Sequence, residues 1–290
     1  MSEYQYYEFL AIDRPLTAEQ QAAVRELSTR ARISATSFMN EYHWGDFKGD
    51  PLELVRRHYD AHLYYANWGT RRLILRLPAA AFDGVDLDVY AVTDAADIAV
   101  NGKYVILDMS SEDEEGDWAD EESYNLGVLS GVRAEVLAGD LRPLYLAWLA
   151  AIGVWERDEA AFDYETDEYT VEPPVPAGLG SLTGPQAALT ELLRLDRDLL
   201  AEAASASAPL GRTRSVEYHT WVEELPDAVK DDALVALLDG DAGAARAALL
   251  AHDRGQAPDV GPDDGARTIG ELLDRAAKRR ENRLAGVPGK

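Results

Sequence analysis

The sequence of 290 residues contains no cysteine. This absence excludes disulfide bonds, cysteine-ligated zinc, iron–sulfur clusters and thiol nucleophiles. No apolar stretch approaches the roughly 20 residues that a membrane-spanning helix needs. Residues 1–7 also lack the basic start and apolar run of a secretory signal. We therefore expect a cytoplasmic protein that does not enter a membrane.

The signatures of the common catalytic and nucleotide-binding sites are missing as well. The sequence has no Gly-x-Ser-x-Gly nucleophile turn, no Gly-x-x-x-x-Gly-Lys-Ser/Thr phosphate loop and no Gly-x-Gly-x-x-Gly motif. These absences argue against nucleotide-dependent chemistry by the common routes. We expect no cofactor, with a divalent metal as the alternative.

Basic residues are scarce. The chain has 28 Lys and Arg against 53 Asp and Glu, a formal net charge of −25. Phosphate contacts need clustered basic side chains, so we expect no direct binding to nucleic acid. Residues 106–180 alone hold 19 acidic and 3 basic residues. Two runs, 112–122 and 163–169, supply most of this charge and are expected to be solvated loops or a surface that recruits a cation or a basic partner.

What the chain does have is enough apolar sequence, 47%, to form a core, and enough length for about two domains. We expect four regions. Residues 1–110 form an α+β domain with an added hairpin, and residues 111–180 an acidic connector with one buried helix at about 139–154. Residues 181–255 are helical, and residues 256–290 hold a flexible linker and a basic terminal helix.

The sequence of residues 1–110 indicates its secondary structure clearly. Strands are expected at 4–12, 33–44 and 71–77, with a turn or short strand around Phe47. Helices are expected at 17–28, where Thr17 and Gln20 form a capping box, and at 51–68, where Asp50 is the cap and Pro51 the first residue. This order predicts a ferredoxin-like sandwich, an antiparallel sheet with two helices on one face.

Beyond residue 78 the pattern becomes mostly helical. Asn101-Gly102 lies between two apolar runs and predicts a hairpin over 98–107. The proline-rich segment 171–176 is expected to be a stiff connector. Helices are then expected at 183–205, 231–238, 242–251 and 268–284. The last of these carries five basic residues and is expected to be either a solvated terminal helix or a docking helix for an acidic surface of this same protein.

One metal hypothesis follows from the expected helix over 51–68. His58 and His62 are four residues apart, and such residues share one face of a helix. His43 and Asp46, just before the helix, are candidates for further ligands. The zincin pattern needs Glu directly after the first His, and Tyr59 stands there instead. The other interpretation is that both histidines are ordinary residues beside the core.

Several segments resemble a family of uncharacterised bacterial proteins with no assigned activity. The resemblance rests on residues 4–9, 36–38, 42–50, 66–70, 111–117 and 173–176, and it is strongest over residues 1–180. It implies no catalytic residues. It marks the turn at 43–50 and the segment 67–69 as places where a site could lie.

The sequence thus favours a non-enzymatic cytoplasmic interaction protein that binds a basic protein partner. The expected contact residues belong to the first acidic run: Glu112, Asp113, Glu114, Glu115 and Asp117. Such a surface would steer a basic partner and make its binding sensitive to salt. The alternative is a metal-dependent hydrolase that uses His43, Asp46, His58 and His62. The turn at 44–51 is expected to be structural, with Asp50 as a helix cap.

Overall fold

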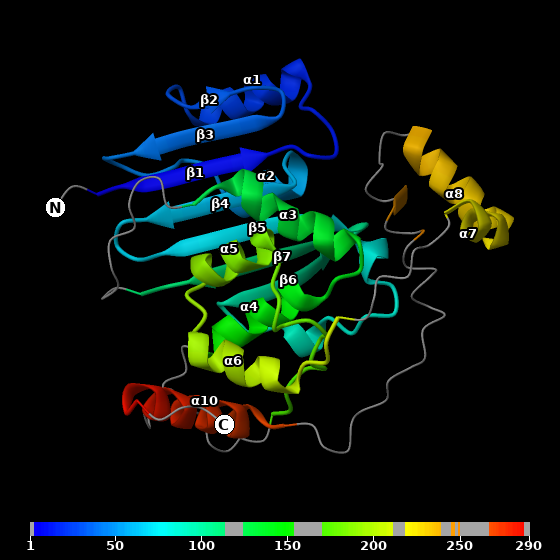
Figure 1. Cartoon of the computed structure of the whole chain (residues 1–290). Helices are drawn as coiled ribbons and strands as arrows, with labels where there is room; N and C mark the ends of the chain where they lie inside the picture. Colours follow the sequence, from blue (N-terminus) through cyan, green and yellow to red (C-terminus); the bar gives the residue numbers. More distant parts are fainter. Residues whose placement is uncertain are drawn as a thin grey trace.

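The computed structural model describes residues 3–113, 124–153, 170–210, 218–238, 245–246, 249 and 267–286. These residues build an α+β fold around a seven-stranded antiparallel sheet in the order β2-β3-β1-β4-β5-β7-β6 (Figure 1). The strands are β1 (Gln5–Leu10), β2 (Arg32–Ile33), β3 (Ser37–Tyr42), β4 (Ala61–Ala66), β5 (Arg71–Pro78), β6 (Ala96–Asn101) and β7 (Tyr104–Ser111).

Two helices lie between strands of the sheet in the chain, and the other helices follow the last strand. The helices are α1 (Ala18–Leu27), α2 (Pro51–Arg57), α3 (Leu126–Leu137), α4 (Arg142–Gly153), α5 (Gly184–Leu192), α6 (Arg197–Ala206), α7 (Tyr218–Glu224), α8 (Asp227–Leu238) and α10 (Ile269–Leu284). Two short 3-10 turns, η1 (Ala79–Phe82) and η2 (Asp88–Tyr90), link β5 to β6.

Alternation along the strands gives the sheet two buried faces, because successive side chains of a strand point to opposite sides. In β1, Tyr7 and Phe9 point to the face that α1 and α2 cover, where Val24 and Val55 complete a smaller core. On the opposite face Leu63 belongs to a larger core under α3 and α4. The sheet is therefore a central layer between helices.

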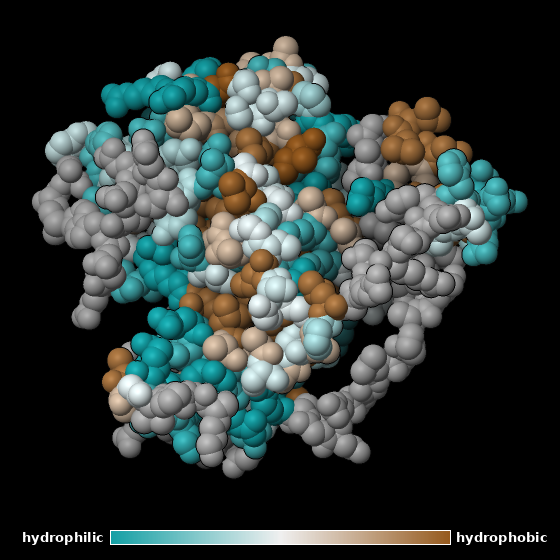
Figure 2. Space-filling model, in the orientation of Figure 1, coloured by the Kyte–Doolittle hydropathy of each residue, from teal (hydrophilic) through white to brown (hydrophobic). Residues whose placement is uncertain are grey.

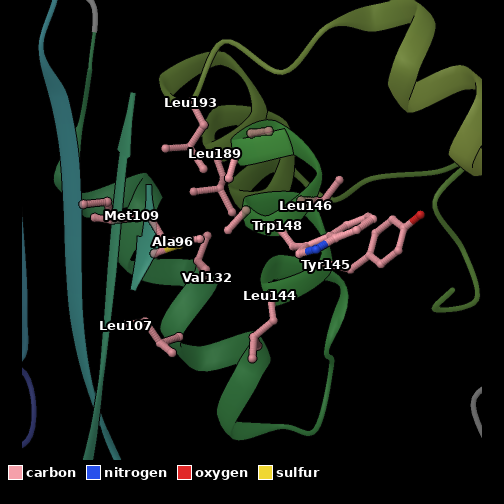
Figure 3. Close-up of a cluster of buried hydrophobic side chains, with 14 of the residues drawn as sticks. Ala96, Leu107, Met109, Val132, Leu144, Tyr145, Leu146, Trp148, Leu189 and Leu193 are labelled. Carbon is pink, nitrogen blue, oxygen red and sulfur yellow. The ribbon is translucent and has the colours of Figure 1, made fainter. Parts of the chain in front are cut away.

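The larger core joins the two halves of the sequence. Helix α4 is buried along its whole length except at Gly153. Figure 3 shows Leu189 and Leu193 from the α5 region on the side of the strand residues Leu107 and Met109, and Tyr145 and Trp148 of α4 on the side away from them. Helices α6 and α10 add Leu199 and Leu272 to the same cluster. The C-terminal helices thus pack on the unit that contains the sheet.

The pair α7–α8 differs from the other helices. Leu234, Val235 and Leu238 are exposed, and Figure 2 shows hydrophobic residues gathered there at the upper right. No single helix in the described part of the chain is both long and apolar enough to cross a membrane. Helices α3 and α4 reach the required length and composition only together, and they bend by 118° where they meet.

Several expectations from the sequence are confirmed. Thr17 and Gln20 form the capping box of α1, and the Asp50 carboxylate accepts hydrogen bonds from the backbone N–H groups of Leu52 and Glu53. The Asn101-Gly102 hairpin joins β6 to β7, and Gly102 has the positive φ of 61° that this tight turn requires. Helices α4 and α10 lie close to their predicted positions.

The predicted helix over 51–68 is wrong in its second half. Helix α2 ends at Arg57, and the chain enters β4 at Ala61. Buried Asp60 separates the two elements, because its carboxylate accepts hydrogen bonds from the backbone N–H groups of Ile12 and Asp13. β4 then lies between β1 and β5 and is buried on both faces. A short apolar run of this kind has no periodicity that distinguishes strand from helix.

Three further predictions are corrected. No strand forms at Phe47, whose ring is buried in the smaller core, and the short strand is β2. The predicted helix over 183–205 is divided into α5 and α6, and Arg194 between them has a φ of 53°. Helix α3 lies inside the region expected to be an acidic connector. The helix expected at 242–251 lies largely outside the described residues.

Candidate functional site

One end of the sheet collects the segments that the sequence singled out. Gln5 of β1 pairs with both Tyr42 and Ala66, and Arg71 of β5 pairs with Ser111. The chain leaves β3, β4 and β7 at this end, on the left in Figure 1. The segments 43–50, 67–70 and 111–113 therefore meet there, although the last is more than 40 residues from the others in sequence.

Two tryptophans are exposed at this end. Trp44 is 77% exposed and Trp68 is 42% exposed. Tyr42 and Ala66 flank Gln5 on its two sides, so the strands that lead to the two tryptophans are two strand spacings, roughly 10 Å, apart. The Trp68 indole N–H donates a hydrogen bond of 3.1 Å to Thr70 Oγ1, which orients the ring. Tryptophan is enriched among the residues that carry binding energy at protein interfaces.

A small cavity of about 160 Å³ opens at the same end of the sheet, where β6 and β7 meet α4. Its apolar lining comes from Ala150, Ala151 and Leu193, and its polar lining includes the acidic residues Asp94 and Glu112. Pockets for cofactors and drug-sized ligands measure about 300–1,000 Å³. This cavity is therefore of a size for one side chain or a very small molecule. It is lined by Asp94, Ala95, Ser110, Ser111, Glu112, Ala150, Ala151 and Leu193.

Backbone strain is concentrated at the same place. In the described part of the chain two non-glycine residues have positive φ, Asp94 at 66° and Arg194 at 53°. Asp94 lines the cavity, and its carbonyl oxygen accepts a hydrogen bond of 3.0 Å from Ser110 Oγ. Arg194 directly follows Leu193, another lining residue. Strained residues persist where the surrounding structure holds them, and they cluster at binding and catalytic sites.

Arg194 contacts the residues at the start of the first acidic run. Its guanidinium donates to Ser111 Oγ at 3.0 Å and to the Gly69 carbonyl at 2.7 Å, and its Nε lies 3.9 Å from an Asp113 carboxylate oxygen. Arg71 lies nearby, with its guanidinium over the Tyr124 ring. Burial, together with the positive charge of Arg71, lowers the pKa of Arg194. The end of β7 is thereby fixed to the β4–β5 turn.

The predicted contact residues lie partly here. Glu112 is exposed and lines the cavity, and Asp113 is half-buried beside Arg194. Glu114, Glu115 and Asp117 lie outside the described residues, as does the second acidic run at 163–169. The sheet end thus includes the first two members of the predicted set and adds neighbours that the sequence did not indicate.

The four predicted metal ligands are not brought together. His43 packs against the Tyr4 ring and Asp46 accepts a hydrogen bond from the Gln5 amide, both at the sheet end. His58 caps the C-terminus of α2. His62 is paired with Phe9, four residues along β1 from Gln5, which places it roughly 13 Å from that end.

The helical face that His58 and His62 were expected to share does not exist, because His62 belongs to β4. His62 is fully buried, its ring stacks on Phe9 at 4.0 Å, and its Nδ1 donates a hydrogen bond to the Glu8 carbonyl. Burial lowers its pKa to about 3. Among the described residues, no three His, Asp or Glu side chains are grouped so as to hold a metal ion.

Sequence reasoning missed Asp94, Arg71 and Arg194 as members of this region. Asp94 carried a weak signal, since Asp adopts positive φ more readily than most residues. No signal in the sequence indicated Arg194, because its position depends on the break between α5 and α6. Comparison of the chain with family models, with curated proteins and with solved structures found no match.

Proposed function

We propose that this chain is a non-enzymatic cytoplasmic interaction protein that binds a basic protein partner through the sheet-end surface, which we define as Trp44, Trp68, Asp94, Glu112 and Asp113. One observation carries the proposal. Asp94 and Glu112 line a small cavity with partly apolar walls, at the same end of the sheet as the two exposed tryptophans.

Lysine and arginine side chains match such a cavity. Their aliphatic stems pack on apolar atoms while the charged head reaches carboxylates, and the lining by Ala150, Ala151 and Leu193 offers the apolar part. Charge-assisted hydrogen bonds to carboxylates are stronger than neutral ones. Indole rings attract further cations through their π faces. These features support a partner that presents several basic residues and inserts one of them.

The charge of the whole chain supports the same partner. A net charge of −25, with much of the excess in the segment that starts at this surface, raises the rate of encounter with basic molecules. Salt screens such attraction over a Debye length of about 8 Å at physiological ionic strength. The proposed binding is therefore expected to weaken as salt increases.

The proposal extends to the fold and family of the first half. We propose a ferredoxin-like arrangement for residues 5–66, supported by the order β2-β3-β1-β4 and by α1 and α2 on a single face. In this arrangement β4 takes the place that the sequence had given to residues 71–77. The resemblance to the bacterial family over residues 1–180 is part of the same proposal, since segments that carry it meet at the sheet end.

The test is calorimetric titration of the full chain with an arginine-rich peptide at low salt. Asp94→Asn with Glu112→Gln should weaken binding by about tenfold or more, because hydrogen bonds to charged groups contribute about 1.5–3 kcal/mol each. Asn tolerates positive φ as Asp does, so the fold should be unchanged. The matched control is Asp231→Asn with Asp232→Asn on α8, which removes the same charge from two exposed positions.

Trp44→Ala should weaken binding as well, with no effect on the melting temperature, because this side chain is mostly exposed. If the α8 control weakens binding as much as the cavity variant does, the attraction is a general property of the acidic chain. That result would contradict a specific site at the sheet end.

A further inference from the structure

The basic terminal helix α10 is docked on an acidic part of its own chain. It lies beside α6 at the bottom of Figure 1, and in the described part of the chain α6 is the element that it contacts most. The two helices are antiparallel, since Arg283 near the end of α10 pairs with Asp198 at the start of α6, while Arg279 pairs with Glu202 one turn later.

Four carboxylates line the contact and define what we call the acidic groove: Glu172, Asp196, Asp198 and Glu202. Arg283 donates to both oxygens of Asp198, the shortest contact being 2.7 Å. Arg280 lies 2.9 Å from Asp196 and Arg279 3.2 Å from Glu202. At the start of α10, Arg267 donates to both oxygens of Glu172, at 2.7 and 2.8 Å.

Ion pairs and apolar packing share this attachment. In the 16 residues of α10, the buried side chains are those of Ile269, Leu272 and Ala276. Leu273 is partly buried against the same core. Most of the remaining residues are charged or exposed, and Figure 2 shows hydrophilic residues at the lower left, where α6 and α10 lie. The docked state therefore depends in part on ion pairs, which salt and competing cations weaken.

The groove in turn requires a cationic occupant. Asp198 and Glu172 are buried, and a buried carboxylate without a partner is costly. The Arg283 guanidinium holds the pKa of Asp198 below its usual range. Glu172 also accepts a hydrogen bond from the Tyr145 hydroxyl, which fixes it in the core. Any occupant must place arginines where α10 places them.

We propose that the acidic groove is a second binding site, specific for a basic amphipathic helix of a partner protein, and that α10 occupies it in cis as a built-in competitor. The partner helix would carry arginines at the spacing of Arg279, Arg280 and Arg283, with small or apolar residues at the spacing of Leu272 and Ala276. This inference builds on the proposed function in that the partner is basic, but it uses a different surface.

The experiment measures binding of a fluorescent synthetic peptide of residues 267–286 to the full chain by anisotropy at low salt. In the wild type α10 fills the groove, so binding of the peptide to the groove should be weak. Arg279→Glu with Arg283→Glu should release α10 and raise the affinity for the peptide by about tenfold or more. The matched control is Arg275→Glu with Lys278→Glu, which changes the charge equally at two exposed positions on the same helix and should leave binding weak.

Adding Asp198→Asn and Glu202→Gln to the released variant should abolish this gain in affinity. The proposal is overturned if the released variant keeps its cooperative melt but binds the peptide no better than wild type, or if it loses that melt, since α10 would then be a fixed part of the fold. The gain in affinity on release of α10 should be the same when Asp94→Asn and Glu112→Gln are also present, so that failure here and failure at the sheet end can be distinguished.

Discussion

His62 shows how one buried residue can link stability to pH. The Glu8 carbonyl can only accept a hydrogen bond, so Nδ1 carries the proton and Nε2 is an acceptor, which finds no partner in the described part of the chain. The ring is neutral in the fold because burial lowers its pKa from 6.5 to about 3. The unfolded chain binds a proton at this residue near pH 6.5.

The stability that His62 contributes is therefore fully present above pH 6.5 and is lost as the pH falls from about 6.5 to about 3. The loss amounts to at most about 5 kcal/mol, at 1.36 kcal/mol for each unit of pKa difference. His62→Phe should keep the stacking on Phe9 and flatten this part of the stability curve. Urea unfolding at a series of pH values measures it.

The control at this scale is His219→Phe, because His219 is exposed on α7. This variant should leave the pH dependence as it is in the wild type. A His62→Phe curve as steep as the wild-type curve between pH 6.5 and 4 would show that other groups, such as the paired carboxylates, dominate acid unfolding.

At the scale of the element, helix α2 depends on its cap. It has only seven residues, and the Asp50 carboxylate accepts hydrogen bonds of 2.8 and 3.3 Å from the N–H groups of Leu52 and Glu53. Asp50→Ala should cost about 1 kcal/mol of stability and leave peptide binding at the sheet end unchanged. Chemical denaturation measures the loss of stability. The control is Glu26→Ala, at an exposed position on α1. Loss of binding at wild-type stability would instead make Asp50 part of the site.

Elements with a local signal could be predicted from the sequence. Caps and tight turns depend on neighbouring residues, and the structure confirms them together with the strand expected at 71–77. β4 could not be predicted, since its strand state is set by pairing with β1 and β5 on either side. Helix α3, which follows the acidic run, was not predicted either. Its buried residue Arg133 pairs with Asp13, which is distant in sequence.

The candidate site was predictable only in part for the same reason. Glu112 and Asp113 were indicated by the charge of their run, and the turn at 43–50 by the family resemblance. Their approach to Trp68 and Arg194 follows from the strand order and from the break before α6, and neither has a local signal. Pairing between strands that are distant in sequence brings these residues together. Local sequence patterns do not indicate which strands pair.

For the whole molecule, salt should act in two opposite directions. The net charge of −25 makes the folded chain repel itself, so screening by about 0.5 M NaCl should raise the melting temperature. The same screening weakens the ion pairs between α10 and the acidic groove. Thermal melts followed by circular dichroism should therefore show stabilisation, while hydrogen exchange of residues 267–286 becomes faster. A parallel increase in protection of α10 would contradict a role for these ion pairs in its docking.

The position of β1 also determines the order in which the molecule can be assembled. It is the first strand to be synthesised, yet it lies between β3 and β4 in the sheet, so that Tyr6 pairs with Glu41 and Tyr65. A chain leaving the ribosome therefore exposes the rings of Tyr7 and Phe9 until β4 has emerged. The larger core closes later still, because α5 and α6 must first be made. Such distant pairing slows folding and leaves apolar surface open to chaperones during synthesis.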